Sequence, residues 1–523
     1  MAHSYTSEKL RFKAAEQYKQ AFSRNENPFV AYVAIGNHIP YADENTPDDI
    51  KDTVATEKGV WDNMIAAKKI TGNDVELVIP RISWQANSVY RQYDDTIQIS
   101  ELLSANASQN LQPMYVINSE GNVYKCISNN VGTYATVEPI GQNLNGNGNV
   151  LTADNYIWKY MYNVLTTNKF ASNTWIPAPT STAKLGYSGS ALTTIDGELL
   201  TIAVDDAGSG YKNNTFTVSA FAAACTVLTV DYSVDMPNVF AVNMGVSGEG
   251  IVGDAYITAI DTVSRKINLA YSTTSSGGGT GNTLNVFTRV VIQGDGTGAL
   301  ATPTVSNGAI SKIALTNFGS DYTYADVLIY GTATGANVAN ARAILSPKFG
   351  HGFNSAMDLG AHNVMIAIKL GEVDSTEGNV ISTNTSFRQY SLLSGPYKYN
   401  ESETVSYTNA NSVISQTTDI SLIAGDSYLP NEFVYQGQIS NPSFSGYVNT
   451  QTPSTINLTG VRGSVTIGSV LKGTTTNPTG RTVFSIDYPE FEPYTGDIQY
   501  AENFVKIERN DGQAENIKFI VKF

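Results

Sequence analysis

The residues best suited to chemistry are the histidines, two of which share one short segment. His351 and His362 lie eleven positions apart with Asp358 between them, whereas His3 and His38 are far away in the sequence. A zinc site usually combines three or four ligands at closer spacing. We therefore expect no metal site, and a loop histidine that hydrogen-bonds to backbone is the better interpretation.

Carboxylate pairs are the second candidate, because glycoside hydrolysis uses two acidic side chains. Asp94-Asp95 and Asp205-Asp206 are adjacent pairs, and neighbours on a strand point to opposite faces, so neither pair forms a site alone. The GDGTGA segment at 294–299 lacks the ending and the following helix of a phosphate loop, and a glycine-rich turn is the better interpretation. We predict no enzyme, no catalytic residue, no cofactor and no metal ligand.

Composition narrows the class of partner. The 523 residues carry a formal net charge of −15, which disfavours nucleic acid, since binding it relies on Lys and Arg neutralising phosphates. The first 22 residues contain no apolar core, so we expect no signal peptide, and no stretch approaches the ~20 apolar residues of a membrane helix. We expect a soluble protein made in the cytoplasm. Cys126 and Cys225 lie in apolar runs and are expected to be buried free thiols.

The elements around these residues are predicted to be mostly strands. Apolar residues at helical spacing predict a helix over 6–22 and another over 48–69. Runs of aromatic and β-branched residues predict strands, and Ser-Glu-Gly-Asn at 119–122 predicts a hairpin turn. The predicted strand segments are 28–36, 74–84, 96–102, 112–118, 122–129 and 156–164.

The middle of the chain, rich in Gly, Thr and Ser, contains an internal repeat. GELLTIAVDDAGSGY at 197–211 resembles GAISKIALTNFGSDY at 308–322, with equal spacing between two glycines and the final tyrosine. Each copy predicts a strand, a Gly turn and a Tyr packed back over the turn. Segment 253–273 predicts a hairpin that turns at 261–265, and the Asn-Asp-Gly sequence ending at 512 predicts a C-terminal hairpin.

The order of the aromatic segments resembles a known family. PFVAYVAIG, GVWDNM, VELVIPRISW, MYVINSEGNVYKCI, YIWKYMYNV and WIPAP follow one another, and the chain closes with IQYAENFVKIERNDGQAENIKFIVKF. This series resembles the dimeric baseplate wedge protein of T-even-like contractile-tailed bacteriophages. The recurring elements correspond to Trp61, to 78–81 with Trp84, and to 500–503.

The resemblance implies a structural role without catalysis. A family member ties neighbouring wedge proteins together, including tail-fibre-connecting proteins, and moves as a rigid unit when the baseplate rearranges. It implies a homodimer located in the virion tail baseplate and assembled in the host cytoplasm. The candidate structural or interface residues are Trp61, Pro80, Arg81, Trp84, Trp158, Trp175, Tyr500, Glu502 and Asn503. The tryptophans lie in apolar runs, so core or interface packing is favoured over sugar stacking.

The expected fold is mainly β, with a multi-layer β-sandwich core, a few short helices and inserted Gly/Thr-rich β domains. The family member is shorter and lacks most of 185–345 and 390–490. The expected division is 1–184 core, 185–345 insertion with the repeat, 346–389 core, 390–489 second insertion and 490–523 core strands. Two other functions stay open: a receptor- or glycan-binding tail protein whose inserts are the binding heads, and a carbohydrate-active enzyme. The first predicts exposed aromatic clusters in the inserts, where Tyr211, Tyr232, Tyr256, Tyr271, Tyr322, Tyr324 and Tyr330 lie.

Overall fold

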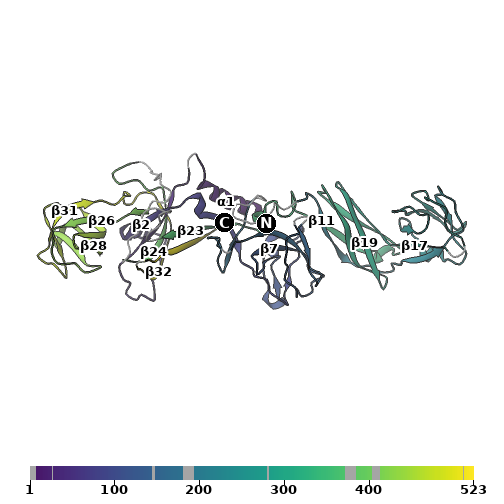
Figure 1. The fold of residues 1–523 in the computed structure, drawn as a ribbon, viewed down its shortest axis with the longest axis horizontal. Helices are drawn as coiled ribbons and strands as arrows, with labels where there is room; N and C mark the ends of the chain where they lie inside the picture. Colours follow the sequence, from purple (N-terminus) through teal and green to yellow (C-terminus); the bar gives the residue numbers. More distant parts are fainter. Residues whose placement is uncertain are drawn as a thin grey trace, which may run out of the picture. The chain divides into compact units, whose positions relative to one another are not determined.

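A computed structural model confirms the predicted fold class: the protein is mainly β, with 45% strand against 10% helix (Figure 1). The structure describes residues 7–25, 28–143, 148–165, 167–180, 194–279, 282–370, 385–402, 413–510 and 512–523. The chain forms two compact units. Unit 1 comprises Met1–Val78 and Ala361–Phe523, and unit 2 comprises Ile79–Gly360. The expected boundary near residue 184 lies outside the described residues, and the five-part division stays a prediction.

Unit 1 contains a five-stranded antiparallel sheet in which the two ends of the chain meet. Its strand order is β25 (Val413–Ser415), β2 (Met64–Lys69), β1 (Ala31–Gly36), β24 (Thr385–Ser394) and β32 (Asp497–Arg509). A second sheet contains β3 (Val75–Pro80), β23 (Asn363–Leu370) and β33 (Glu515–Lys522). Every residue of β1 is buried, which matches its uninterrupted apolar sequence.

The helices of unit 1 begin at capped residues. α1 (Glu8–Ala21) starts at Ser7, whose hydroxyl accepts the Leu10 N–H, and this helix confirms the prediction over 6–22. The helix predicted over 48–69 is wrong at both ends. α2 spans only Val54–Asn63, residues 48–53 before it are not helical, and the residues after it form β2, which pairs with β1. Pairing with the buried strand β1 stabilises this apolar run more than a continued helix would, although its local periodicity is helical.

A closed six-stranded barrel also belongs to unit 1. Its cyclic order is β26 (Thr418–Leu422), β29 (Thr455–Gly463), β28 (Asn441–Gln451), β27 (Phe433–Gln438), β30 (Val470–Gly473) and β31 (Arg481–Asp487). Apolar side chains such as Ile420, Val434 and Leu458 fill its interior. Closure removes the free strand edges that an open sheet would expose.

Unit 2 begins with an aromatic sheet whose order is β6 (Tyr115–Ile117), β7 (Asn122–Ser128), β9 (Ile157–Asn163) and β8 (Asn149–Leu151). β6 and β7 form the predicted hairpin, with Gly121 in the left-handed region at φ 81°. The strand predicted over 96–102 is wrong, because Ile99–Leu102 forms the short helix α3. Other short elements of unit 2 are β4 (Val89–Tyr90), β5 (Leu111–Gln112), β10 (Trp175–Pro177), α4 (Met236–Val239) and α5 (Ser355–Asp358).

The repeat forms a module in unit 2 with reciprocal contacts between its two copies. A sheet of β11 (Leu199–Asp206), β22 (Asn340–Leu345), β21 (Ala325–Tyr330) and β18 (Arg289–Gly294) shares one core with the hairpin of β19 (Thr297–Ser306) and β20 (Ala309–Ser320). The Tyr211 N–H donates to the Gly308 carbonyl, and the Tyr322 N–H donates to the Gly197 carbonyl. In each copy, the carbonyl of the first glycine therefore accepts a hydrogen bond from the N–H of the tyrosine that ends the other copy.

The remaining strands of unit 2 form two small sheets around one apolar core. One contains β12 (Asn214–Thr217), β17 (Thr283–Phe287) and β14 (Gly245–Ser247), and the other contains β13 (Val227–Thr229), β16 (Lys266–Leu269) and β15 (Ile257–Asp261). β15 and β16 form the hairpin predicted over 253–273. The expected burial of both thiols holds for Cys126, whereas Cys225 is half-buried.

The C-terminal hairpin prediction is right about the strands and wrong about their pairing. β32 pairs with β24 and β33 pairs with β23, so the two strands that flank the turn belong to different sheets. Arg509 and Glu515, both buried, form an ion pair at 2.9 Å across this turn. The charge pair, rather than a ladder of backbone hydrogen bonds, joins the two strand ends.

Candidate functional site

Strand β32 of unit 1 is the candidate interface. It is the last strand of its sheet, so among the described residues its second edge has no strand partner. The edge also carries apolar side chains: Tyr500 is 45% exposed and Val505 is 54% exposed. A long edge strand with free backbone groups and exposed apolar residues is a template for pairing with another chain. Strand β32 can therefore add a partner strand without disturbing the interior of the sheet.

The Tyr500-Ala501-Glu502-Asn503 motif lies on this strand. The Tyr500 hydroxyl donates to the Glu502 carboxylate at 2.7 Å, and its ring meets Phe519 edge-on with centroids 5.7 Å apart. Partial burial, with the Glu502 carboxylate as a second cause, raises the pKa of Tyr500 to about 12. Tyr500 is thus a neutral, oriented hydrogen-bond group on an exposed surface.

Asn503 holds the loop of residues 37–53 against the sheet. Its amide donates to the Asp48 carbonyl at 2.9 Å, and its side-chain oxygen accepts from Gln389 at 2.8 Å. A groove of about 410 Å³ lies between this loop, α2 and β24, and both Gln389 and Asn503 line it. The amide hydrogen bonds of Asn503 therefore set the position of one wall of the groove.

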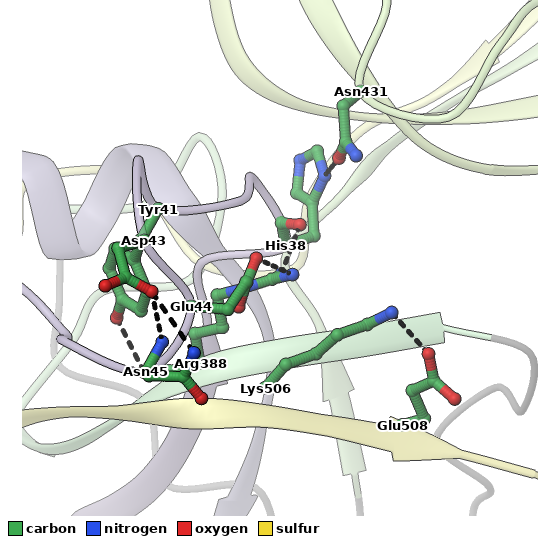
Figure 2. Close-up of polar contacts among 9 residues, drawn as sticks. All are labelled: His38, Tyr41, Asp43, Glu44, Asn45, Arg388, Asn431, Lys506 and Glu508. Atoms are coloured by element: carbon green, nitrogen blue, oxygen red, sulfur yellow. Dashed lines mark hydrogen bonds and ion pairs between the residues drawn. The ribbon is translucent and has the colours of Figure 1, made fainter.

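Arg388 fixes the other end of the same loop (Figure 2). Its guanidinium donates to both Glu44 oxygens, at 2.8 and 2.7 Å, and to the His38 carbonyl at 2.7 Å. Tyr41 closes the arrangement by donating its hydroxyl to the Arg388 carbonyl at 3.0 Å. The hydrogen bonds from Arg388 hold the pKa of Glu44 below its usual range. We call Arg388, Glu44, His38 and Tyr41 the loop lock.

His38 connects the loop lock to the barrel. Its ring nitrogen Nδ1 lies 2.6 Å from the Asn431 side-chain oxygen, and Nε2 contacts the Thr459 hydroxyl. Because the Asn431 oxygen can only accept, Nδ1 carries the proton. Burial lowers the pKa of His38, and the positive charge of Arg388 lowers it further. The lowered pKa favours the neutral imidazole, in which Nδ1 donates to Asn431 and Nε2 accepts from the Thr459 hydroxyl.

Unit 2 contains a second charge cluster, which is sealed from solvent. Lys125 of β7 and Lys159 of β9 are cross-strand neighbours, and both are buried. Lys159 lies 3.6 Å from Glu198, with both side chains about 1% exposed. Burial lowers the pKa of Lys159 and raises the pKa of Glu198, so each group depends on the other to stay charged. We call Lys125, Lys159, Glu198 and His351 the sealed cluster.

His351 completes the sealed cluster. Its Nδ1 lies 3.2 Å from the Lys125 ammonium, which can only donate, so the imidazole is neutral with its proton on Nε2. That Nε2 is buried and has no hydrogen-bond partner among the described residues. Burial lowers the pKa of His351 well below its usual value, and Lys125 and Lys159 lower it further. The backbone-bonded loop histidine expected at this position is wrong, because Lys125 is the partner.

The acidic pairs are used in an ion-pair network. Arg342 contacts Asp94 at 2.6 Å and Asp205 at 3.2 Å, so one member of each predicted pair meets at a single guanidinium. Desolvation raises the pKa of Asp94, but the hydrogen bonds from Arg342 and Thr96 together with the Arg342 charge outweigh it, so the pKa lies below its usual value. This bridge joins the loop after β4 to strand β11 within unit 2.

The predicted site residues separate into the two units. Trp61 is buried in the core of unit 1, and Tyr500, Glu502 and Asn503 lie on β32. The other predicted residues belong to unit 2: Pro80, Arg81, Trp84, Trp158 and Trp175. Trp158 is fully buried and stacks on Tyr156 at 5.6 Å, whereas Trp84 and Trp175 are half-buried and Pro80 is exposed. Only the β32 residues form a surface cluster.

The sequence analysis singled out His351 but not its companions Lys125, Lys159 and Glu198, and it did not identify the Arg388–Glu44 pair of the loop lock. A usable signal was present: Lys125 and Lys159 each interrupt a run of aromatic and aliphatic residues in a strand, in VYKCI and IWKYM. The signal is weaker for Arg388, which has both aromatic and polar neighbours in SFRQY. A strand that is apolar on both faces has no solvent face for a charged side chain, so such a cation needs a buried partner. The sequence does not indicate which carboxylate supplies it.

No group of three or more His, Cys, Asp or Glu among the described residues is arranged to hold a metal ion. None of the helices in the described ranges is both long and apolar enough to cross a membrane. No model of a known protein family matches the chain, and no curated protein sequence does so.

Proposed function

We propose that this chain is a non-enzymatic subunit of the baseplate wedge of a contractile-tailed bacteriophage, where it links neighbouring wedge proteins. The open edge of β32 is the observation that carries the proposal. Of the residues on which the resemblance rests, Tyr500, Glu502 and Asn503 lie on this edge strand. Their position favours recognition of another protein, because the sheet core does not require an exposed tyrosine at 500.

The arrangement of charges supports a subunit that moves as a rigid unit. Arg388 and Arg509 are almost fully buried and each forms an ion pair with a carboxylate in unit 1, and Lys159 does so in unit 2. Breaking the Arg509–Glu515 or the Lys159–Glu198 pair, in which both partners are buried, leaves an uncompensated charge, which costs about 3–5 kcal/mol and penalises local deformation. Differential contacts at the surface before and after contraction would then act on units that keep their internal structure.

The same proposal includes the partners. We infer that the chain forms a homodimer, binds other wedge subunits including tail-fibre-connecting proteins, and resides in the virion tail after assembly in the host cytoplasm. Dimerisation is checked by light scattering on the purified chain, with an expected mass of twice 56.2 kDa. A monomer at every concentration tested would remove the dimer from the proposal.

The wedge role is tested by affinity capture from infected-cell lysate, with the bound proteins quantified by mass spectrometry. We expect other baseplate subunits in fixed proportion to the tagged chain. The matched variant is Val505→Lys, which places a charge on the exposed edge, and it should recover fewer of these subunits. Recovery of host envelope glycans or receptors without wedge proteins would contradict the proposal.

A further inference from the structure

We propose that unit 2 contains a binding groove for an acidic sugar residue, lined by Arg289, Tyr256, Asn243, Gln293 and Tyr330. The groove lies beside strands β18 and β21 and has a volume of about 410 Å³. That volume lies in the small-ligand range of about 300–1,000 Å³, whereas a protein partner needs a contact of about 800 Å² on each side. This inference is independent of the wedge proposal.

Arg289 is the anchor of the groove. It is half-buried, and its guanidinium lies 4.2 Å from the Tyr256 ring centroid. Among the described residues its guanidinium has neither a hydrogen-bond acceptor nor a carboxylate partner, in contrast to the bidentate pairing of Arg388 with Glu44. A guanidinium stacked on an aromatic ring keeps its planar fork of donors free, and that fork matches a carboxylate.

The charge of the lining favours an anion. The chain contains 47 acidic residues, yet none of them lines the groove, and Arg289 is its single ionised group. Asp326 lies opposite Gln293 in the ladder, beyond the lining. A ligand carboxylate that enters therefore meets a cation that no protein carboxylate neutralises.

The rest of the lining suits a sugar ring. Arg289 pairs with Tyr330 across the ladder, and Val291 pairs with Leu328, so an apolar floor continues from the cation along one face. Tyrosine and aliphatic side chains pack against the C–H face of a pyranose. The amides of Asn243 and Gln293 supply both donors and acceptors for hydroxyl groups. An anion without a ring, such as phosphate, would leave this floor and these amides unused.

The test is a saturation-transfer NMR titration of the full chain with three probes. Methyl β-D-glucuronide carries the carboxylate and methyl β-D-glucoside is its neutral twin. Inorganic phosphate, an anion without a ring or C–H protons, is tested as a competitor that lowers the glucuronide signal. The variants are Arg289→Gln, Gln293→Ala and the matched control Lys312→Gln, which removes one charge from an exposed position on β20 outside the groove.

We expect the glucuronide to bind about tenfold more tightly than the glucoside, because a hydrogen bond between charged groups is stronger than one between neutral groups. Arg289→Gln should abolish that preference, Gln293→Ala should weaken both sugars, and Lys312→Gln should change neither. Equal binding of the two sugars, an unchanged Arg289→Gln variant, or phosphate binding as tightly as the glucuronide would overturn the proposal. If Arg289→Gln fails to fold, the preference of the wild type for the glucuronide and the binding by Gln293→Ala still test the proposal.

Discussion

The two charge clusters differ in their access to solvent and in how fully their polar atoms are bonded. In the sealed cluster Lys159 and Glu198 are about 1% exposed, and neither oxygen of Glu198 accepts a hydrogen bond within normal distance among the described residues. In the loop lock Arg388 is 2% exposed, whereas Glu44 is 38% exposed and accepts from the guanidinium through both oxygens. The sealed cluster is therefore shielded from water, whereas the carboxylate of the loop lock is in contact with it.

This difference indicates two roles for buried charge in one chain. The sealed cluster can only stabilise or destabilise the interior of unit 2, because no solvent or ligand reaches it. The loop lock holds residues 37–53 beside strand β32, so its geometry is transmitted to a surface. We therefore expect substitutions in the sealed cluster to act on stability, and substitutions near β32 to act on assembly.

The largest expected effect is that of Lys159→Met, which strands Glu198 in the interior of unit 2. Removing one partner of a buried pair costs about 3–5 kcal/mol in the free energy of unfolding. The double variant Lys159→Met/Glu198→Leu should recover most of that loss, because it removes both members of the ion pair and strands neither. Urea unfolding followed by tryptophan fluorescence measures both. A single variant as stable as the wild type would show that the pair is dispensable.

Acid should weaken unit 2 through His351. Its folded pKa lies well below the unfolded value of about 6.5, so as the pH falls below about 6.5 the unfolded chain binds a proton that the folded chain excludes. The stabilising effect of a neutral His351 is thus present above about pH 6.5 and is lost below it. The urea midpoint of the wild type should therefore fall as the pH drops below about 6.5, and His351→Gln should make that fall smaller. His38→Gln is the matched variant in unit 1, and an equal reduction of the fall in that variant would contradict the contrast between the clusters.

A smaller stability effect is expected for Arg388→Lys. A lysine cannot donate to both Glu44 oxygens and to the His38 carbonyl at once, so the loop loses part of its attachment. The solvent exposure of Glu44 limits the cost, because that carboxylate can be hydrated when the fork is lost. The decrease in urea midpoint should be smaller than that of Lys159→Met. A larger decrease would place the loop lock among the main stabilising features.

The smallest stability effect is expected for Val505→Lys, whose position is 54% exposed. Surface substitutions of this kind change the free energy of unfolding by within about 0.5 kcal/mol. The same variant should still lose wedge proteins in affinity capture, because the added charge opposes strand pairing at the edge. Loss of stability together with capture would mean that β32 acts through folding alone.

The elements that could be predicted from sequence are those with strong local signals. The first helix, the hairpin at 119–122 and the hairpin at 261–265 follow from capping and turn residues. Two errors arose where tertiary pairing outweighed local pattern. Residues 64–69 continue a helical periodicity yet pair with β1, and the segments beside the Asn-Asp-Gly turn join different sheets.

The candidate site was partly predictable for a related reason. The motif at 500–503 was identified by resemblance, and its place on an edge strand depends on sheet order, which local sequence does not specify. The partners of Arg388 and Lys159 lie 344 and 39 positions away, in Glu44 and Glu198. A buried cation can be recognised from its apolar neighbours, but its carboxylate cannot be chosen at such distances without the fold.

Cross-linking mass spectrometry on complexes captured from infected cells tests the central claim most directly. Lys506 lies on β32 with an exposed side chain, whereas Lys312 lies on β20 in unit 2 and is the internal comparison. We expect cross-links to other baseplate subunits to arise at Lys506 and to be lost in Val505→Lys. Cross-links to those subunits from Lys312 but none from Lys506, or none to any baseplate subunit, would contradict the claim.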